Sequence, residues 1–298
     1  MNALNQLLTT LKIEANIYKN GQYCGMWAID TSGAQRMTFH IVSKGRCYLL
    51  IDDETLEMNT GDAIFFPHDA SHRISNVTHQ DVPINATTTE KMSSTLNGES
   101  TGLVCGNFEN NHPLFPRLLQ QLPKYIHIQA TQNSSSKKII DLICEESLQI
   151  DESSSLLLNR LADCLFYALL RDHTDTTSGL FSAFSHPQLN KSLELIHKNT
   201  HQNFTLDELA SEAGMSRSAF ANIFKEMIGQ TPMEYVTQWR MTQAYRWLAD
   251  EGISTLAAAL RSGYDNEASF SKAFKRIIGF GPGRARSVYK KLMNEDQQ

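Results

Sequence analysis

Nine polar residues in the last third of the chain have the side-chain chemistry that contacts with DNA require. Arginine and lysine can donate to phosphate or guanine, asparagine can pair with adenine, and glutamate can accept from the amino group of cytosine. We predict that Lys225 and Lys275 hold phosphates. The nine candidates are Ser216, Arg217, Ser218, Asn222, Lys225, Glu267, Ser271, Lys272 and Lys275.

These candidates belong to an approximate internal repeat, in which Leu206–Tyr235 is echoed by Leu256–Ala285. In each copy, a segment rich in Ala and Leu with helical spacing ends at a glycine, Gly214 or Gly263. Glycine adopts the left-handed backbone that alanine reaches only with strain, so a sharp turn between two helices is predicted. The next helix opens at a polar cap, which is Ser216 in the first copy and either Asp265 or Asn266 in the second.

Phenylalanines four residues apart indicate which face of that second helix is buried: Phe220 and Phe224, then Phe270 and Phe274. The opposite face is left for a partner, as in a helix-turn-helix whose second helix enters the major groove. We predict such motifs at about 207–227 and 255–278. The alternative is a plain helical bundle with a solvated basic face, but two copies with matching Gly, Phe, Lys, Gly and Pro positions favour DNA binding.

The segment Ile196–Arg286, about a third of the chain, resembles the DNA-binding domain of AraC/XylS transcription regulators. It carries SRSAFANIFKEMIGQTPMEY, WRMTQAYRWL and GYDNEASFSKAFKRIIGFGP in the family's order. The resemblance implies double-stranded DNA and RNA polymerase as partners, a homodimer, and an activator role, although the sequence leaves activation or repression open. It also implies that a long helix, Pro232–Asp250, sets the two recognition helices in successive major grooves about 34 Å apart.

The front of the chain reads as short strands, with runs such as Met37–Val42, Cys47–Ile51 and Ala63–Phe66. The segment Gly45–Ile74 resembles a cupin core, in which a Gly-Asp turn leads into a strand and then P-x-x-x-x-H. The strand that carries a His-x-His pair in catalytic cupins reads Cys-Tyr-Leu-Leu here. No enzymatic activity is therefore expected, and a cupin enzyme fused to a DNA-binding module is the rival hypothesis.

Within that resemblance, the front domain is similar to cupin-type sensors that carry two histidines and a late Leu-x-Cys-Gly motif. In this chain these residues are His40, His72 and Cys105. Imidazole and thiolate suit zinc, so a metal site at these three residues is one hypothesis, with no cofactor as the other. The alternative role of the histidines is hydrogen bonding inside the barrel or lining the pocket of an organic effector.

Some regulators with this architecture respond to oxidants, so Cys24 and Cys105 are candidates for redox sensing. A thiol near an imidazole can ionise and oxidise selectively. The competing interpretation is a small core hydrophobe on a strand. The signal is therefore expected to be a small molecule, a metal or an oxidant, unless the barrel serves only dimerisation in a constitutive DNA-binding protein.

The predicted fold is an N-terminal all-β cupin-like barrel with appended helices, followed by an all-α double helix-turn-helix. The domains are predicted at 1–135 for the barrel, 136–172 for helices that connect or dimerise, 173–187 for the linker and 188–291 for the DNA-binding domain. The net charge is −5 over 298 residues, and the part from His186 onward carries +2 against −7 before it. No stretch has the length of a membrane helix and no leader peptide is visible, so a cytoplasmic location is expected.

Overall fold

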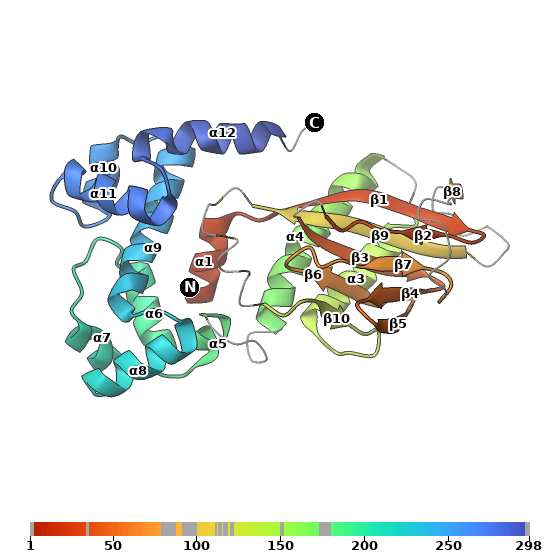
Figure 1. Ribbon diagram of the computed structural model, residues 1–298, viewed down its shortest axis with the longest axis horizontal. Coiled ribbons are helices and arrows are strands. Elements are labelled where there is room, and N and C mark those ends of the chain that lie inside the picture. The colour runs from red at the N-terminus through yellow and green to blue at the C-terminus, as the bar shows by residue number, and fades with distance from the viewer. Residues whose placement is uncertain are drawn as a thin grey trace. The chain divides into compact units, whose positions relative to one another are not determined.

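The computed structural model (Figure 1) describes most of the chain and divides it into two compact units. The described residues are 3–33, 36–78, 88–90, 100–110, 112, 115, 119, 122–149, 152–172 and 180–295. One unit comprises Ile13–Glu109 and Leu122–His173; the other comprises Met1–Lys12, Asn110–Gln121 and Thr174–Gln298. Among the described residues, no helix has the length and apolar character needed to cross a bilayer.

The first unit, here called the barrel unit, is built from two β-sheets. The larger sheet runs in the order β10 (Ile126–Ile128), β6 (Ala63–Phe66), β3 (Met37–Lys44), β9 (Ser100–Glu109), β1 (Glu14–Cys24) and β8 (Thr88–Glu90). The smaller sheet runs β2 (Ala28–Ile29), β7 (Arg73–Ser75), β4 (Arg46–Ile51) and β5 (Glu54–Asn59). The predicted all-β front is confirmed.

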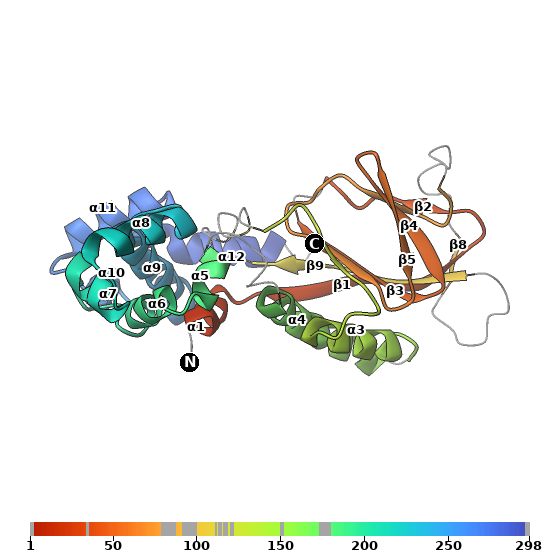
Figure 2. The same cartoon turned by 90° about the horizontal axis from the view of Figure 1, so that it is seen from below.

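Strand β3 is buried along nearly its whole length because both faces of its sheet are covered. On the outer face, Phe39 and Phe108 pack against each other, and Phe108 packs on Phe166 of α4 (Glu152–Asp172). Figure 2 shows α4 and its neighbour α3 (Ser135–Glu146) side by side along this sheet. Successive side chains on a strand point to opposite faces, so His40 lies on the inner face, toward the second sheet.

The turn before β6 is fixed by Asp62. Its carboxylate accepts hydrogen bonds from the backbone N–H groups of Asn59 (2.8 Å) and Ala130 (2.6 Å). Gly61 precedes it with φ of +87°, in the left-handed region that favours glycine. The Gly-Asp turn predicted from the cupin resemblance is therefore present and leads directly into a buried strand.

The second unit, here called the helical unit, is almost entirely α-helical. Its helices are α1 (Ala3–Leu11), α5 (Leu180–Ser185), α6 (Leu189–Lys198), α7 (Leu206–Glu212), α8 (Arg217–Ile228), α9 (Pro232–Arg246), α10 (Thr255–Arg261), α11 (Glu267–Ile278) and α12 (Ala285–Glu295). A π-helical turn, Trp247–Glu251, extends α9, and a 3-10 turn, Pro282–Arg284, precedes α12. The predicted long helix Pro232–Asp250 thus corresponds to α9 and its π-helical continuation.

The domain prediction placed residues 1–135 in the barrel, but the N-terminal helix α1 groups with the helical unit. There it contacts α5, α6 and α9. Its apolar face buries Leu4, Leu7, Leu8 and Leu11. Thr10 accepts a hydrogen bond from the Gln243 side chain at 2.8 Å. An amphipathic helix needs an apolar partner surface, and here α6 and α9 supply it.

The predicted linker also differs from the structure. Of the predicted linker 173–187, residues 173–179 lie outside the described residues, and Leu180–Ser185 is helical. Phe181 and Phe184 in that helix are buried, which explains why it is not an open linker. In the barrel unit, residues 79–87 and 91–99 lie outside the described residues; β8 pairs with β1, and β9 begins at Ser100.

Candidate functional site

The first helix-turn-helix copy has a specific side-chain or glycine signal at each of its boundaries. Helix α7 starts at a capping box in which the Thr205 side chain accepts from the N–H of Glu208 and the Glu208 carboxylate accepts from the N–H of Thr205. The turn contains Gly214 at φ of +64°. Ser216 caps α8 by accepting from the N–H of Ala219, and Gly229 closes that helix in the left-handed conformation.

The second copy repeats this design with one difference in the turn. Ser254 caps α10, Gly263 makes the turn at φ of +73°, and Asn266 caps α11. Asn266, rather than Asp265, is therefore the cap of α11. The cap follows the turn glycine by two residues in the first copy and by three in the second, so the second turn is one residue longer.

Helices α8 and α11 have the same burial pattern at all twelve positions. Their buried face is Phe220, Phe224 and Ile228 in one copy, and Phe270, Phe274 and Ile278 in the other. The predicted contact residues lie on the remaining faces: Ser216, Arg217, Ser218, Asn222, Lys225, Glu267, Lys272 and Lys275 are exposed, and Ser271 is half-buried. Arg276 is an exposed base beside Lys275 that is not among the predicted contact residues, and its counterpart in α8 is Glu226.

Arg217 already has an acidic neighbour. Its guanidinium lies 3.2 Å from Asp207, and both side chains are about two-thirds exposed, at 65% and 68%. An exposed ion pair of this kind contributes little to stability and is screened by salt. Arg217 can therefore exchange Asp207 for a phosphate or a base edge at small cost.

The two copies are held together by contacts around α9. The Arg240 guanidinium donates to the carbonyl oxygens of Thr200 (3.1 Å) and Gln202 (2.7 Å) and to the Asn203 side chain (3.0 Å). Gly263 packs against the same segment, because a Cβ on it would lie 2.4 Å from the carbonyl oxygen of His201. The turn of the second copy is thus seated on the segment that leads into the first.

Inside the barrel unit, His40 and His72 meet directly. Their Nε2 atoms lie 3.0 Å apart, and the Thr31 hydroxyl lies 3.1 Å from the first and 3.2 Å from the second. His72 Nδ1 lies 2.7 Å from the carbonyl oxygen of Ala70. A carbonyl only accepts, so neutral His72 carries its proton on Nδ1 and presents a bare Nε2 to His40 and Thr31.

Burial keeps both rings neutral. Desolvation lowers the pKa of His40 well below its ordinary value, and the neighbouring His72 lowers it further. Desolvation also lowers the pKa of His72, against the hydrogen bond to Ala70 and the charges of Asp30 and Asp69, which raise it. The histidine pair is therefore a source of neutral donors and acceptors rather than of charge.

Cys105 lies opposite His40 in the pairing of β9 with β3, so sequence and structure agree that it is near the pair. Desolvation raises the pKa of the Cys105 thiol to about 12, against the charge of Lys19, which lowers it. The thiolate is the form that binds metals and reacts with oxidants, and burial disfavours it here. Cys24 is half-buried at the end of β1.

The predicted metal set is only partly assembled. His40 and His72 come together, but within the described ranges no group of three or more His, Cys, Asp or Glu side chains is placed to hold an ion. A closed zinc site needs four ligands and a catalytic one three from the protein. Two imidazoles and the Thr31 hydroxyl therefore fit zinc poorly.

The glycine after Cys105 has a packing role. A Cβ on Gly106 would lie 2.4 Å from the Phe39 ring and 2.9 Å from the carbonyl oxygen of Asn16. Because Gly106 has no Cβ, the Phe39 ring can lie across strand β9 on the outer face of the sheet. The two residues of the Cys-Gly pair therefore act on opposite faces of the sheet: Gly106 makes room for Phe39 on the outer face, and the Cys105 thiol lies on the inner face.

Comparison with known proteins places both units. Residues 2–175 match a family model described as Cupin, and residues 209–287 match one described as Helix-turn-helix domain. A putative AraC-like transcription regulator of Streptomyces antibioticus is 29% identical over 96% of this chain and 98% of its own length. The transcriptional regulator AlkR of Acinetobacter baylyi is 25% identical over 96% and 99%. The RCS-specific transcriptional activator RclR of Escherichia coli is 24% identical over 98% and 99%.

Proposed function

The chain belongs to the cupin-containing AraC-type transcription regulators, and we propose that it reads DNA through the exposed faces of α8 and α11 under the control of its barrel. The observation that carries this proposal is the identical burial pattern of the two helices. It leaves polar side chains exposed on the same face of both helices, including the matched pairs Asn222 with Lys272 and Lys225 with Lys275. A bundle that served packing alone would not require basic residues at those positions.

Six of the nine residues take distinct roles in this proposal. Arg217, Asn222 and Lys272 lie in the first half of their helices, where a recognition helix reaches base edges. Lys225 and Lys275 lie in the last turns and hold phosphates. Glu267, at the first position of α11, accepts from a cytosine amino group. The two helices enter successive major grooves on one side of the duplex.

Selection from random duplexes with the full chain tests this reading of DNA. The enriched sequence should be bound about 10- to 100-fold more weakly by Arg217→Ala and by Lys272→Ala, as expected for a lost base contact. Lys191→Ala is the matched control, because Lys191 is an exposed base on α6, outside both motifs. A chain that enriches no sequence, or variants that bind as the wild type does, would contradict the proposal.

A homodimer formed through α3 and α4 supports binding to repeated half-sites. Leu142, Leu156 and Leu157 on these helices are 50%, 64% and 47% exposed, which is unusual for leucine on covering helices. Sedimentation should show a dimer that Leu156→Glu dissociates. Leu260→Glu, at a 56% exposed leucine on α10, should leave the dimer intact.

RNA polymerase is the partner in activation, the role proposed for this chain. Transcription in vitro from a promoter placed next to the selected site should increase when the protein is added. Transcription that falls instead would identify a repressor and would remove polymerase contact from the proposal.

The barrel receives the signal, with an organic molecule as the favoured effector. The chain is not proposed to be an enzyme, in keeping with relatives that are named as regulators. The donor set beside His40 and His72 fits zinc poorly, and Cys105 is held as a thiol. We therefore assign the histidine pair the role of forming hydrogen bonds beside a bound effector.

A further inference from the structure

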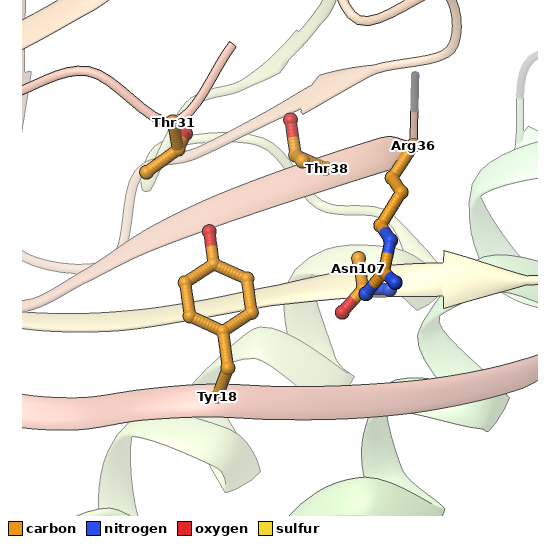
Figure 3. A pocket seen from close by; sticks show the side chains of 5 residues that line it. All are labelled: Tyr18, Thr31, Arg36, Thr38 and Asn107. Atoms are coloured by element: carbon orange, nitrogen blue, oxygen red, sulfur yellow. The ribbon is translucent and has the colours of Figure 1, made fainter. Parts of the chain in front are cut away.

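A pocket of about 380 Å³ opens into the barrel unit beside the histidine pair. It is lined by Tyr18 of β1, Thr31 after β2, Arg36 and Thr38 at the start of β3, and Asn107 of β9. Figure 3 shows the Tyr18 hydroxyl pointing between Thr31 and Thr38, while Arg36 reaches toward Asn107. Pockets of roughly 300 to 1,000 Å³ hold small organic ligands.

Two polar atoms at this pocket are buried and have no hydrogen-bond partner in the described part of the chain. They are Thr38 Oγ1 and Asn107 Oδ1, on side chains that are 3% and 1% exposed. Thr38 and Asn107 are paired across β3 and β9, so they lie side by side on one face. Leaving a buried polar group unpaired costs about 1 to 3 kcal/mol, which a ligand can recover.

The pocket lining supplies more donors than acceptors. Arg36 offers five N–H groups, and among the described residues one of its nitrogens contacts Glu109, at 3.3 Å. Partial burial raises the pKa of Tyr18 above its ordinary value, so its hydroxyl keeps the proton and remains able to donate. The described residues that line the pocket include no carboxylate, and Glu109 stands beside it as the partner of Arg36 and of the Asn107 amide.

We propose that this pocket binds a small organic carboxylate, whose oxygens accept from the Arg36 guanidinium and the Thr38 hydroxyl. Asn107 Oδ1 accepts from a hydroxyl or amino group on the same molecule, and the Tyr18 ring with the threonine methyl groups covers its carbon skeleton. The guanidinium is planar and matches a carboxylate with two parallel hydrogen bonds. The proposal rests on the regulator function above and names the class of its effector.

Thr31 links this pocket to the histidine pair. Its hydroxyl lines the pocket and also lies within hydrogen-bond distance of both Nε2 atoms. The bare Nε2 of His72 needs a donor, which Thr31 or His40 provides. A ligand oxygen that accepts from Thr31 would leave His40 as the donor to His72, so occupancy changes the hydrogen bonds inside the barrel. An effector must favour one of two such arrangements in order to regulate.

Calorimetric titration of the full chain, without DNA, tests the ligand class. The probes are butyrate, benzoate, salicylate and phenylacetate, each paired with the primary amide of the same skeleton, together with a neutral polyol, mannitol. We expect at least one carboxylate to bind at least 10-fold more tightly than its amide. Arg36→Gln should remove that preference. Thr38→Val, which keeps the side-chain shape at an unpaired hydroxyl, should weaken binding several-fold.

Arg46→Gln is the matched control, because Arg46 is an exposed arginine on β4 that pairs with Glu57 outside the pocket. It should bind the carboxylate as the wild type does. The proposal is overturned if no carboxylate binds, if the amides or mannitol bind equally well, or if Arg36→Gln retains the preference. DNA selection is independent of this titration, so failure of the pocket and failure of the regulator function give separate results.

Discussion

The turn glycine Gly263 lies against the backbone of His201, with only 2.4 Å between the carbonyl oxygen of His201 and the place where a Cβ would stand. This contact joins the second helix-turn-helix to the segment that leads into the first. Arg240 reinforces it with hydrogen bonds to the same segment. Two recognition helices can reach two grooves together only if their separation is fixed, and these contacts help to fix it.

Gly263→Ala should therefore destabilise the helical unit much more than Gly214→Ala. Both glycines have positive φ, which costs alanine about 1 kcal/mol, but at Gly214 no atom of the described residues lies within 4 Å of a Cβ. The collision with His201 should raise the loss at Gly263 to about 3 kcal/mol. Thermal unfolding of the two variants makes the comparison, and equal losses would show that the contact can relax freely.

Acid should destabilise the helical unit through His197. Desolvation lowers its pKa to about 3, against the hydrogen bond to the carbonyl of Ala3, which raises it. In the unfolded chain the pKa is about 6.5. The unfolded state binds the extra proton between these values, so the stability is complete above pH 6.5 and is lost as the pH falls toward 3.

Between pH 7.5 and 5.5 this histidine should cost about 1.4 kcal/mol. Measuring the free energy of unfolding at the two pH values, for the wild type and for His197→Gln, isolates its share. The variant should lose about 1.4 kcal/mol less than the wild type, while His112, whose pKa desolvation lowers to about 4, keeps part of the dependence in both. An unchanged pH dependence in His197→Gln would show that His197 does not stay neutral in the folded state.

Lys225 and Lys275 should act on the salt dependence of DNA binding rather than on sequence preference. Replacing either by glutamine removes one phosphate contact, so the slope of log affinity against log salt should fall by about 1. Discrimination between the selected site and a scrambled site should stay the same. A variant that loses discrimination would place that lysine at a base edge.

Alkylation of the Leu156→Glu variant, in which α4 should not be covered by a second subunit, should spare Cys105 and modify Cys164 first. Cys164 is exposed, whereas Cys105 is 1% exposed with a pKa raised to about 12. Mass spectrometry after brief treatment with iodoacetamide reads the order of modification. Rapid modification of Cys105 would revive the redox hypothesis, because it would mean that the barrel opens to give an accessible thiolate.

Much of the DNA-binding motif could be predicted from the sequence, because its signals are local. Caps, turn glycines and phenylalanines at four-residue spacing act within one or two helical turns, and the structure has them where they were expected. The one-residue difference between the two turns left the cap open between Asp265 and Asn266. The structure settles that choice in favour of Asn266, whose extended backbone lets its side chain accept from the N–H of Ser269.

The barrel was less accessible to this kind of reasoning, since its site is made by strand register. Alternation along β3 already puts Thr38 and His40 on one face. The pairing of Thr38 with Asn107, and of His40 with Cys105, depends on how β9 aligns with β3. Tyr18, Thr31 and Arg36 carried no local signal at all, because each reaches the pocket from a different segment.

Local patterns were enough to predict the class of protein, the two helix-turn-helix motifs and the cupin-like front, and to mark His40 and His72 as candidates. The tertiary structure decided which core the amphipathic helix Ala3–Leu11 joins and which polar side chains share a pocket. An apolar helix face fits any apolar surface of suitable shape, and a hydroxyl or guanidinium gains a role only from its neighbours. Those neighbours are set by long-range packing, which a linear pattern does not encode.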